Sequence, residues 1–251
     1  MKYLHATILL LASLNSYATS STASESVAVF NGLINEETVD QFLRLHEDRL
    51  ELKEISIASQ GGEVGAALKL ARWVRLKKLN VRVRMICFSA CANYIFVAGE
   101  KKYIEPGAFV AWHGDVEQKD FRDFVAEYKR IADKKLQFHQ LEKNEIELLE
   151  KNNEKYKYIT RLQIEQLDLF QALGINPIIG RIGQEPVMFK SDGWSFTVKA
   201  MEYFGITNII APTDYGSFNY FRRNPAASFV NGGPLLIFDV DSAGNIMPMN
   251  P

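Results

Sequence analysis

A serine lies where a predicted strand passes into a predicted helix. The alternating apolar residues over 81–86 predict the strand, and the apolar run over 90–98, ended by Gly99, predicts the helix. The first turn of a helix has free backbone N–H groups and the positive end of the helix dipole. Ser89 is therefore typical of a simple helix cap, but the position also suits a nucleophile, because the N–H of Ala90 would face the oxyanion that forms on attack.

Two glycines and a histidine follow other predicted strands. Gly61 and Gly62 come after a short buried strand at 55–58. They favour either a plain tight turn or a backbone that approaches a ligand and offers the Gly62 N–H as a second oxyanion donor. His113 comes after a strand at 109–112. A lone histidine there is commonly a surface group, but its imidazole can also take the proton of a nucleophilic serine near neutral pH.

A serine and histidine that act together need a carboxylate to fix the imidazole tautomer. Asp192 is the best candidate in the sequence, although the Asp-Gly pair that it begins is also a common turn. Asp115 is the runner-up because it is close to His113 in sequence. A side chain only two positions along would have difficulty reaching the far ring nitrogen, so Asp192 is preferred.

The fold has to bring these residues together, and the pattern from 26 to 113 predicts how. Predicted strands alternate with helices: a helix capped by Asn35 follows the first strand, and a helix with one apolar face follows Gly62. This alternation indicates an α/β fold with a mostly parallel sheet and helices on its faces. Successive strands of such a sheet end along one edge, where ligands bind. Gly62, Ser89 and His113 are expected to meet there.

The region 118–173 differs in composition from the rest of the chain. It is rich in Lys, Glu and Gln and has no Pro or Gly between Asp120 and Leu173. Aromatic and aliphatic residues recur there at helical spacing, namely Phe121, Phe124, Tyr128 and Ile131. One or two long helices are therefore expected to project from the core as a handle. This handle is either a solvated hairpin without a chemical role or an oligomerisation arm.

Length and composition are those of an ordinary globular protein. The 251 residues are 47% hydrophobic and 24% charged, and the formal net charge is −1. This balance excludes a generally basic nucleic-acid binder and a strongly acidic disordered chain. We expect one domain over 24–222, with the handle inserted in it, and a tail over 223–251 with a hairpin around 242–244.

The N-terminus has the pattern of a secretory signal peptide. A basic residue precedes an apolar run over 6–12, and small residues lead up to Ala18. We expect cleavage after Ala18, which makes 1–18 the signal, with Ala23 as a second cleavage site. The alternative is a transmembrane anchor, but the run is far shorter than the roughly 20 residues that span a bilayer. The mature protein is expected to be secreted or periplasmic, where no ATP is supplied to an ATPase partner.

Two cysteines, Cys87 and Cys91, flank Ser89 in the sequence. In an exported protein two cysteines usually pair, and a strand-end cysteine and one in the first helical turn can have a Cα separation that fits a disulfide. Two buried free thiols are the alternative. The sequence has no metal-ligand cluster, phosphate loop or dinucleotide fingerprint, so neither a metal nor an organic cofactor is expected.

Four stretches of the chain together resemble the ClpP-like serine peptidase branch of the Clp-protease/crotonase superfamily. They are VFNGLINEETVDQFL, EISIASQGGEVGAALKLARWV, CFSACANYIFVAGEKKYIEPGAFVAWH and SDGWSFTVKAMEYFGITNII. That family has a Gly-Gly turn, a strand running into a serine, a strand bearing a histidine and a later aspartate, in this order. An export signal combined with cysteines around the serine resembles its secreted, periplasmic group.

The resemblance implies a ββα spiral fold and a role for each site residue. Ser89 would be the nucleophile, His113 the base and Asp192 the orienting acid. Gly62 and Ala90 would supply the N–H groups of the oxyanion hole. Two offsets depart from the family pattern, since a gap-free overlay puts Ala90 at the nucleophile position and Asp192 needs a shift of one residue.

These observations predict an exported serine endopeptidase that hydrolyses polypeptides without a cofactor. The resemblance to a ring-forming family and the predicted handle favour a homo-oligomer, and neither a nucleic-acid partner nor a membrane span after signal cleavage is expected. The alternative is a catalytically silent binding or scaffold protein on the same fold. A crotonase-type acyl-CoA enzyme is less favoured, because coenzyme A is an intracellular metabolite.

Overall fold

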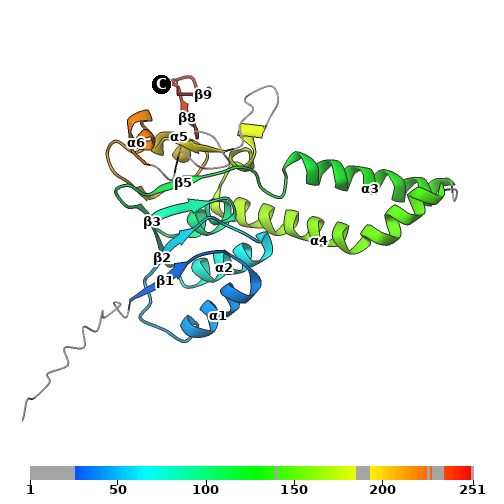
Figure 1. The fold of residues 1–251 in the computed structure, drawn as a ribbon, viewed down its shortest axis with the longest axis horizontal. Helices are drawn as coiled ribbons and strands as arrows, with labels where there is room; N and C mark the ends of the chain where they lie inside the picture. Colours follow the sequence, from blue (N-terminus) through cyan, green and yellow to red (C-terminus); the bar gives the residue numbers. More distant parts are fainter. Residues whose placement is uncertain (1–25, 139–140, 185–192, 225–226, 228–234, 250–251) are drawn as a thin grey trace, which may run out of the picture.

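The computed structural model has an α/β core from which a helical hairpin projects (Figure 1). The described residues are 26–138, 141–184, 193–224, 227 and 235–249. The predicted signal peptide, 1–18, and Asp192 lie outside them.

The core of the described chain is a sheet of six strands. They are β1 (Val27–Asn31), β2 (Glu54–Ser59), β3 (Asn80–Phe88), β4 (Lys102–Ile104), β5 (Phe109–Ala111) and β7 (Ile209–Ile210). The first four and β7 lie side by side in the order β1-β2-β3-β4-β7, while β5 pairs with β3. All of these pairings are parallel. The predicted fold class, α/β with a mostly parallel sheet, is confirmed.

Two helices, α1 (Glu36–His46) and α2 (Val64–Leu76), connect the first three strands. A reciprocal capping box begins α1: the Asn35 side chain accepts from the Thr38 N–H at 2.8 Å, and the Thr38 hydroxyl accepts from the Asn35 N–H at 3.1 Å. The apolar face of α2 is buried and includes three alanines, namely Ala66, Ala67 and Ala71. Small side chains let α2 approach the sheet closely.

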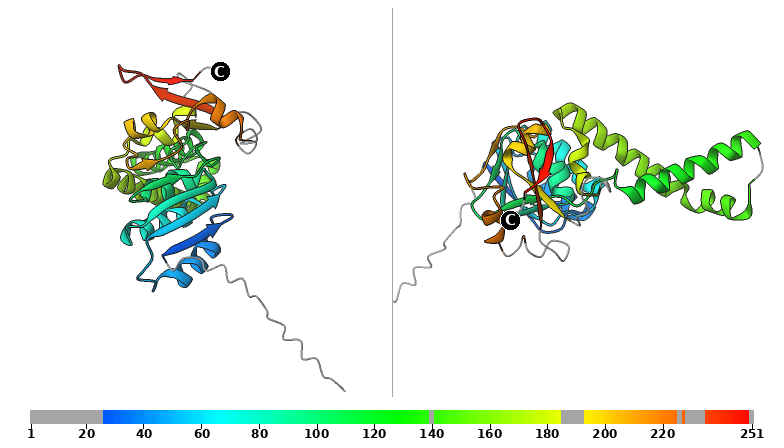
Figure 2. Two further views of the ribbon diagram at one scale, coloured as in Figure 1. Left: turned by 90° about the vertical axis from the view of Figure 1, so that its left-hand side faces the viewer. Right: turned by 90° about the horizontal axis from the view of Figure 1, so that it is seen from above.

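The two helices lie on one face of the sheet (Figure 2). Phe30 of β1 is buried on that side and packs its ring against Phe42 of α1. Val29 points to the opposite face, where it is 43% exposed. That face is largely polar and includes the ion pair between Arg82 and Glu54 at 2.6 Å. Parallel sheets usually have both faces covered, so this face is unusually open within the described chain.

The region 118–173 forms two helices, α3 (Lys119–Phe138) and α4 (Lys143–Leu173), which run side by side away from the core (Figures 1 and 2). Their contacts with each other include the stacked rings of Tyr128 and Tyr156, whose centroids are 4.1 Å apart. The C-terminal half of α4 returns to the core, where Phe170 is buried. Among the helices that the structure describes, none is both long and apolar enough to cross a membrane.

A second, smaller sheet follows the handle. Its strands are β6 (Trp194–Phe196), β8 (Leu236–Val240) and β9 (Ile246–Pro248). The neighbouring helices are two short 3-10 turns, η2 (Pro177–Gly180) and η3 (Ile182–Gln184), and the α-helices α5 (Val198–Tyr203) and α6 (Phe218–Arg222). β8 and β9 pair antiparallel, so the tail contains a hairpin at the expected place. Trp112 and Trp194 exchange two backbone hydrogen bonds of 2.8 Å, which join this sheet to the end of β5.

Candidate active site

Ser89 follows directly after β3, beside the end of β5. β5 pairs with the last residues of β3, and the Ser89 N–H continues that ladder by donating to the Ala111 carbonyl at 3.0 Å. Ser89 has a φ of 59°, one of three positive values among the described non-glycine residues. A left-handed conformation costs roughly 1–2 kcal/mol for such a residue. Strained turns of this kind, between a strand and a helix, present the nucleophilic serine in α/β-hydrolases.

The helix after Ser89 is held to the strand by a disulfide. Cys87 in β3 and Cys91 at the start of a π-helical segment, η1 (Cys91–Phe96), are bonded, with their Cα atoms 5.2 Å apart. Both cysteines are fully buried. The structure therefore has the disulfide and not the pair of free thiols, and the bond spans the Ser89 turn.

The Gly61-Gly62 turn packs directly against the Ser89 turn. A Cβ atom added to Gly61 would lie 2.5 Å from the Phe88 carbonyl oxygen, 2.8 Å from the Ser89 Cβ and 3.0 Å from the Ala90 nitrogen. Gly61 also has a φ of 93°. Both the close approach and the positive φ require glycine here. The structure thus brings together the predicted oxyanion donor segments, with Gly61 as the residue that touches the Ser89 turn.

His113 lies within hydrogen-bond distance of Ser89. The Ser89 Oγ and the His113 Nε2 are 2.6 Å apart. The imidazole packs on the Phe88 ring at a centroid distance of 4.9 Å, and its burial lowers the pKa of His113 below the usual 6.5. A neutral ring at neutral pH can accept the serine proton. The Ser89 hydroxyl is thus engaged with His113, which a simple helix cap does not require.

Asp192, the third member of the predicted triad, lies outside the described residues. The runner-up, Asp115, is described and makes other contacts. Its Oδ1 accepts from the Glu117 N–H at 2.8 Å, and its Oδ2 accepts from the Gln166 side chain at 3.0 Å. Burial raises the pKa of Asp115 to about 6. Among the described carboxylates, none is hydrogen-bonded to the His113 ring, so Asp115 does not take the place of Asp192.

Two amide side chains that sequence reasoning missed hold the backbone around His113. The Gln184 amide donates to the His113 carbonyl at 2.6 Å, and the Asn93 amide donates to the Gly114 carbonyl at 2.7 Å. Gly114 has a φ of 147° and is buried beneath Gln184. These contacts join segments far apart in the chain, so no local pattern in the sequence points to them.

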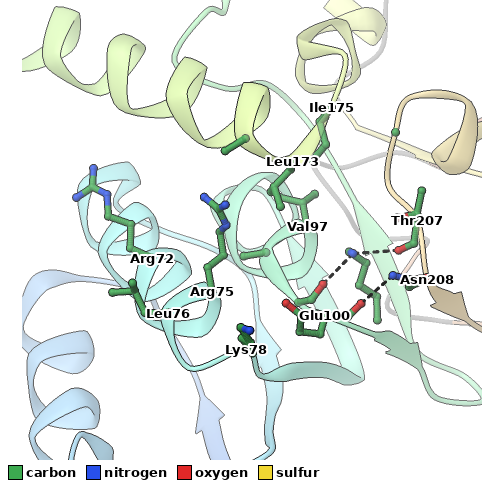
Figure 3. Close-up of a pocket in the computed structure, with 15 residues that line it drawn as sticks. Arg72, Arg75, Leu76, Lys78, Val97, Glu100, Leu173, Ile175, Thr207 and Asn208 are labelled. Atoms are coloured by element: carbon green, nitrogen blue, oxygen red, sulfur yellow. Dashed lines mark hydrogen bonds between the residues drawn. The ribbon is translucent and has the colours of Figure 1, made fainter.

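A cavity of about 590 Å³ lies at the other end of β3, away from Ser89 (Figure 3). Its walls come from residues before β3 and β4 and from the last turns of α2 and α4, including Arg75, Lys78 and Leu173. Lys102 beside it donates to the carbonyls of Gly99 at 2.9 Å and Thr207 at 3.0 Å. Basic side chains at helix C-termini offset the partial negative charge there, which gives this cluster a structural explanation. In the described part of the chain, no group of His, Cys, Asp or Glu could hold a metal ion.

Comparison with known proteins gives similarities among solved structures only. No known protein family matches the chain, and no curated protein is similar to it in sequence. Among solved structures, the chain is similar to a ClpP1 mutant of Listeria monocytogenes, with 20% identity and a TM-score of 0.41, over 76% of this chain and 94% of that one. Similarity at this level does not by itself assign a family or an activity.

Proposed function

We propose that this protein is a serine peptidase in which Ser89 is the nucleophile and His113 the general base. The observation that carries the proposal is the 2.6 Å contact between the Ser89 Oγ and the His113 Nε2 on a strained strand-to-helix turn. Three separate segments converge to form it: the end of β3, the end of β5 and the Gly61-Gly62 turn. A serine and a mostly neutral imidazole in hydrogen-bond contact are the minimal pair for acyl transfer.

In the proposed reaction the Ser89 oxygen attacks the carbonyl carbon of a peptide bond while its proton passes to His113. The negative charge on the carbonyl oxygen is stabilised by the N–H groups of Ala90 and Gly62. His113 then protonates the leaving amine, which gives an acyl-enzyme. Water attacks the ester while His113 takes the proton of the water, and His113 then gives this proton to the Ser89 oxygen as the acid product leaves. Asp192 is proposed to orient the imidazole.

The proposed substrate is an extended polypeptide that binds along an exposed strand edge. The chemistry above requires only protein side chains, backbone N–H groups and water. The protein is also proposed to be exported. The buried Cys87–Cys91 disulfide supports this proposal, because disulfides persist in oxidising compartments. No ATPase partner is proposed there, because ATP is not supplied outside the cytoplasm.

We further propose that the protein acts as a homo-oligomer. Two features support this proposal. The sheet face that carries Val29 is open, whereas parallel sheets usually have both faces covered. The handle also projects far from the core and exposes apolar side chains on both helices, with Leu136 of α3 75% and Ile146 of α4 43% exposed. A second copy of the chain is the proposed occupant of both surfaces.

Hydrolysis of fluorescein-labelled casein by the purified full chain tests the proposed activity. We expect release of labelled peptides by wild type and by the control Ser242→Ala, which removes an exposed serine from the tail turn. We expect no release above background by Ser89→Ala or His113→Ala. Equal hydrolysis by Ser89→Ala would contradict the proposal. A folded, oligomeric wild type that neither hydrolyses polypeptides nor reacts with serine-directed probes would favour the scaffold function instead.

A further inference from the structure

One buried amide connects the handle to both halves of the candidate site. Gln166 on α4 is only 2% exposed, although α4 is otherwise rich in charged, solvated residues. Its Oε1 accepts from the Tyr94 hydroxyl at 2.7 Å, and its Nε2 donates to the Asp115 carboxylate at 3.0 Å. Tyr94 is fully buried and Asp115 is 4% exposed. The Tyr94–Gln166–Asp115 chain is therefore a hydrogen-bonded network shielded from water.

The two partners of Gln166 belong to the two segments that carry the proposed chemistry. Tyr94 lies in η1, in the helix that begins directly after Ser89. Asp115 lies two residues after His113. One side chain of the handle thus bridges the segment of the nucleophile and the segment of the base. Because the Tyr94 hydroxyl donates to the Gln166 oxygen, the NH2 group of the amide faces the Asp115 carboxylate.

We propose that Gln166 is a positioning residue that holds the His113 loop in register with the Ser89 helix. This inference rests on the proposed peptidase function and adds a role for the base of the handle in it. Reacting groups that are misplaced by about 1 Å can lose about 10²-fold in rate. A buried amide that ties both segments to one rigid helix limits such displacements.

The charges that face Asp115 define how the network responds to pH. Its carboxylate accepts from the Gln166 amide and the Glu117 N–H, with Arg181 nearby, and all three favour the ionised form. Burial and the Glu117 carboxylate act in the opposite direction. Tyr94, on the far side of Gln166, is a neutral hydroxyl whose pKa burial raises well above its usual value. Loss of the Gln166 donor should therefore move the pKa of Asp115 further upward.

Two substitutions of the same residue are expected to change the pH profile in opposite directions. Gln166→Leu removes the donor, so activity should fall about 10- to 100-fold at neutral pH and the acid limb of kcat should move to higher pH. Gln166→Glu keeps the shape and can share one proton with Asp115 at low pH, so its activity should be retained best at the acid end and fall as both carboxylates ionise. KM should change less than about threefold in both variants, because the Gln166 side chain bonds to Tyr94 and Asp115 and not to Ser89 or His113.

The experiment measures casein hydrolysis and fluorophosphonate labelling from pH 5 to 9, with the melting temperature recorded for each variant. Gln171→Leu is the matched control, because it removes an exposed amide from the same helix, and Tyr94→Phe provides a milder change if Gln166→Leu fails to fold. The positioning role would be overturned if Gln166→Leu lost the same fraction of activity at every pH. It would also be overturned if Gln166→Leu and Gln166→Glu had the same pH profile of activity. NMR titration of His113 needs no turnover: an altered midpoint in Gln166→Leu supports the role. Absence of labelling in wild type contradicts only the proposed function.

Discussion

Substituting alanine for Gly61 should displace the Ser89 turn without removing any group that takes part in the reaction. The new Cβ would lie 2.5 Å from the Phe88 carbonyl oxygen and 2.8 Å from the Ser89 Cβ, whereas ordinary contacts begin at 3.4 Å. Phe88 and Ser89 therefore have to move by about 1 Å, and a displacement of this size costs about 10²-fold in rate. We expect Gly61→Ala to be labelled at Ser89 about 100-fold more slowly than wild type.

Gly32 provides the control for backbone strain. Its φ of 106° is close to the 93° of Gly61, but a Cβ added there meets nothing within 4 Å. Gly32→Ala and Gly61→Ala should share a destabilisation of roughly 1–2 kcal/mol from the left-handed backbone, which chemical denaturation measures. Only Gly61→Ala should also lose labelling by a fluorophosphonate probe. If the two variants were labelled equally fast, the close packing of the glycine turn on Ser89 would not matter for reactivity.

Three further predictions follow from the same geometry. The rate of Ser89 labelling should rise with pH through a midpoint below 6.5, because burial lowers the pKa of His113; a midpoint above 6.5 would contradict this reasoning. Replacing both Cys87 and Cys91 with alanine should lower the free energy of unfolding by about 2 kcal/mol, as expected for a short disulfide loop, and an unchanged denaturation midpoint would refute it. The pKa of Asp115 is raised from 3.8 to about 6, so the folded state binds the proton more tightly and stability decreases as pH rises between these values, by roughly 3 kcal/mol in total. Asp115→Asn should lack this decrease when unfolding is measured from pH 3.5 to 7.5, and parallel curves for the variant and wild type would contradict the assignment.

The sequence was informative where a local pattern controls the structure. Gly61, Ser89 and His113 each follow a strand, and the rule that parallel strands end along one edge predicted that all three would lie at that edge. The capping residue Asn35 and the amphipathic faces of α1 and α2 are also local signals. The charge of the 118–173 region and its lack of Gly and Pro predicted long helices, but not that the C-terminal half of α4 packs on the core, where Leu169 and Phe170 are buried.

Other parts of the site depend on contacts that no local pattern encodes. β4 has only three residues and begins with a lysine, so it gave no strand signal, yet it pairs with the first half of β3 and leaves the second half to β5. This arrangement places His113 beside Ser89. The amides of Gln184 and Gln166 reach the His113 loop from segments far along the chain. Polar residues in a charged helix show no periodic signal that separates Gln166 from its solvated neighbours.

The central claim is that the Ser89 hydroxyl is an activated nucleophile, and its reaction with a fluorophosphonate probe, located by peptide mass spectrometry, tests this most directly. The account predicts a single adduct on Ser89 in wild type, at least about 10²-fold slower formation in His113→Gln, and none in Ser89→Ala. A folded wild-type protein without an adduct on Ser89, or with the same adduct rate in His113→Gln, would contradict it.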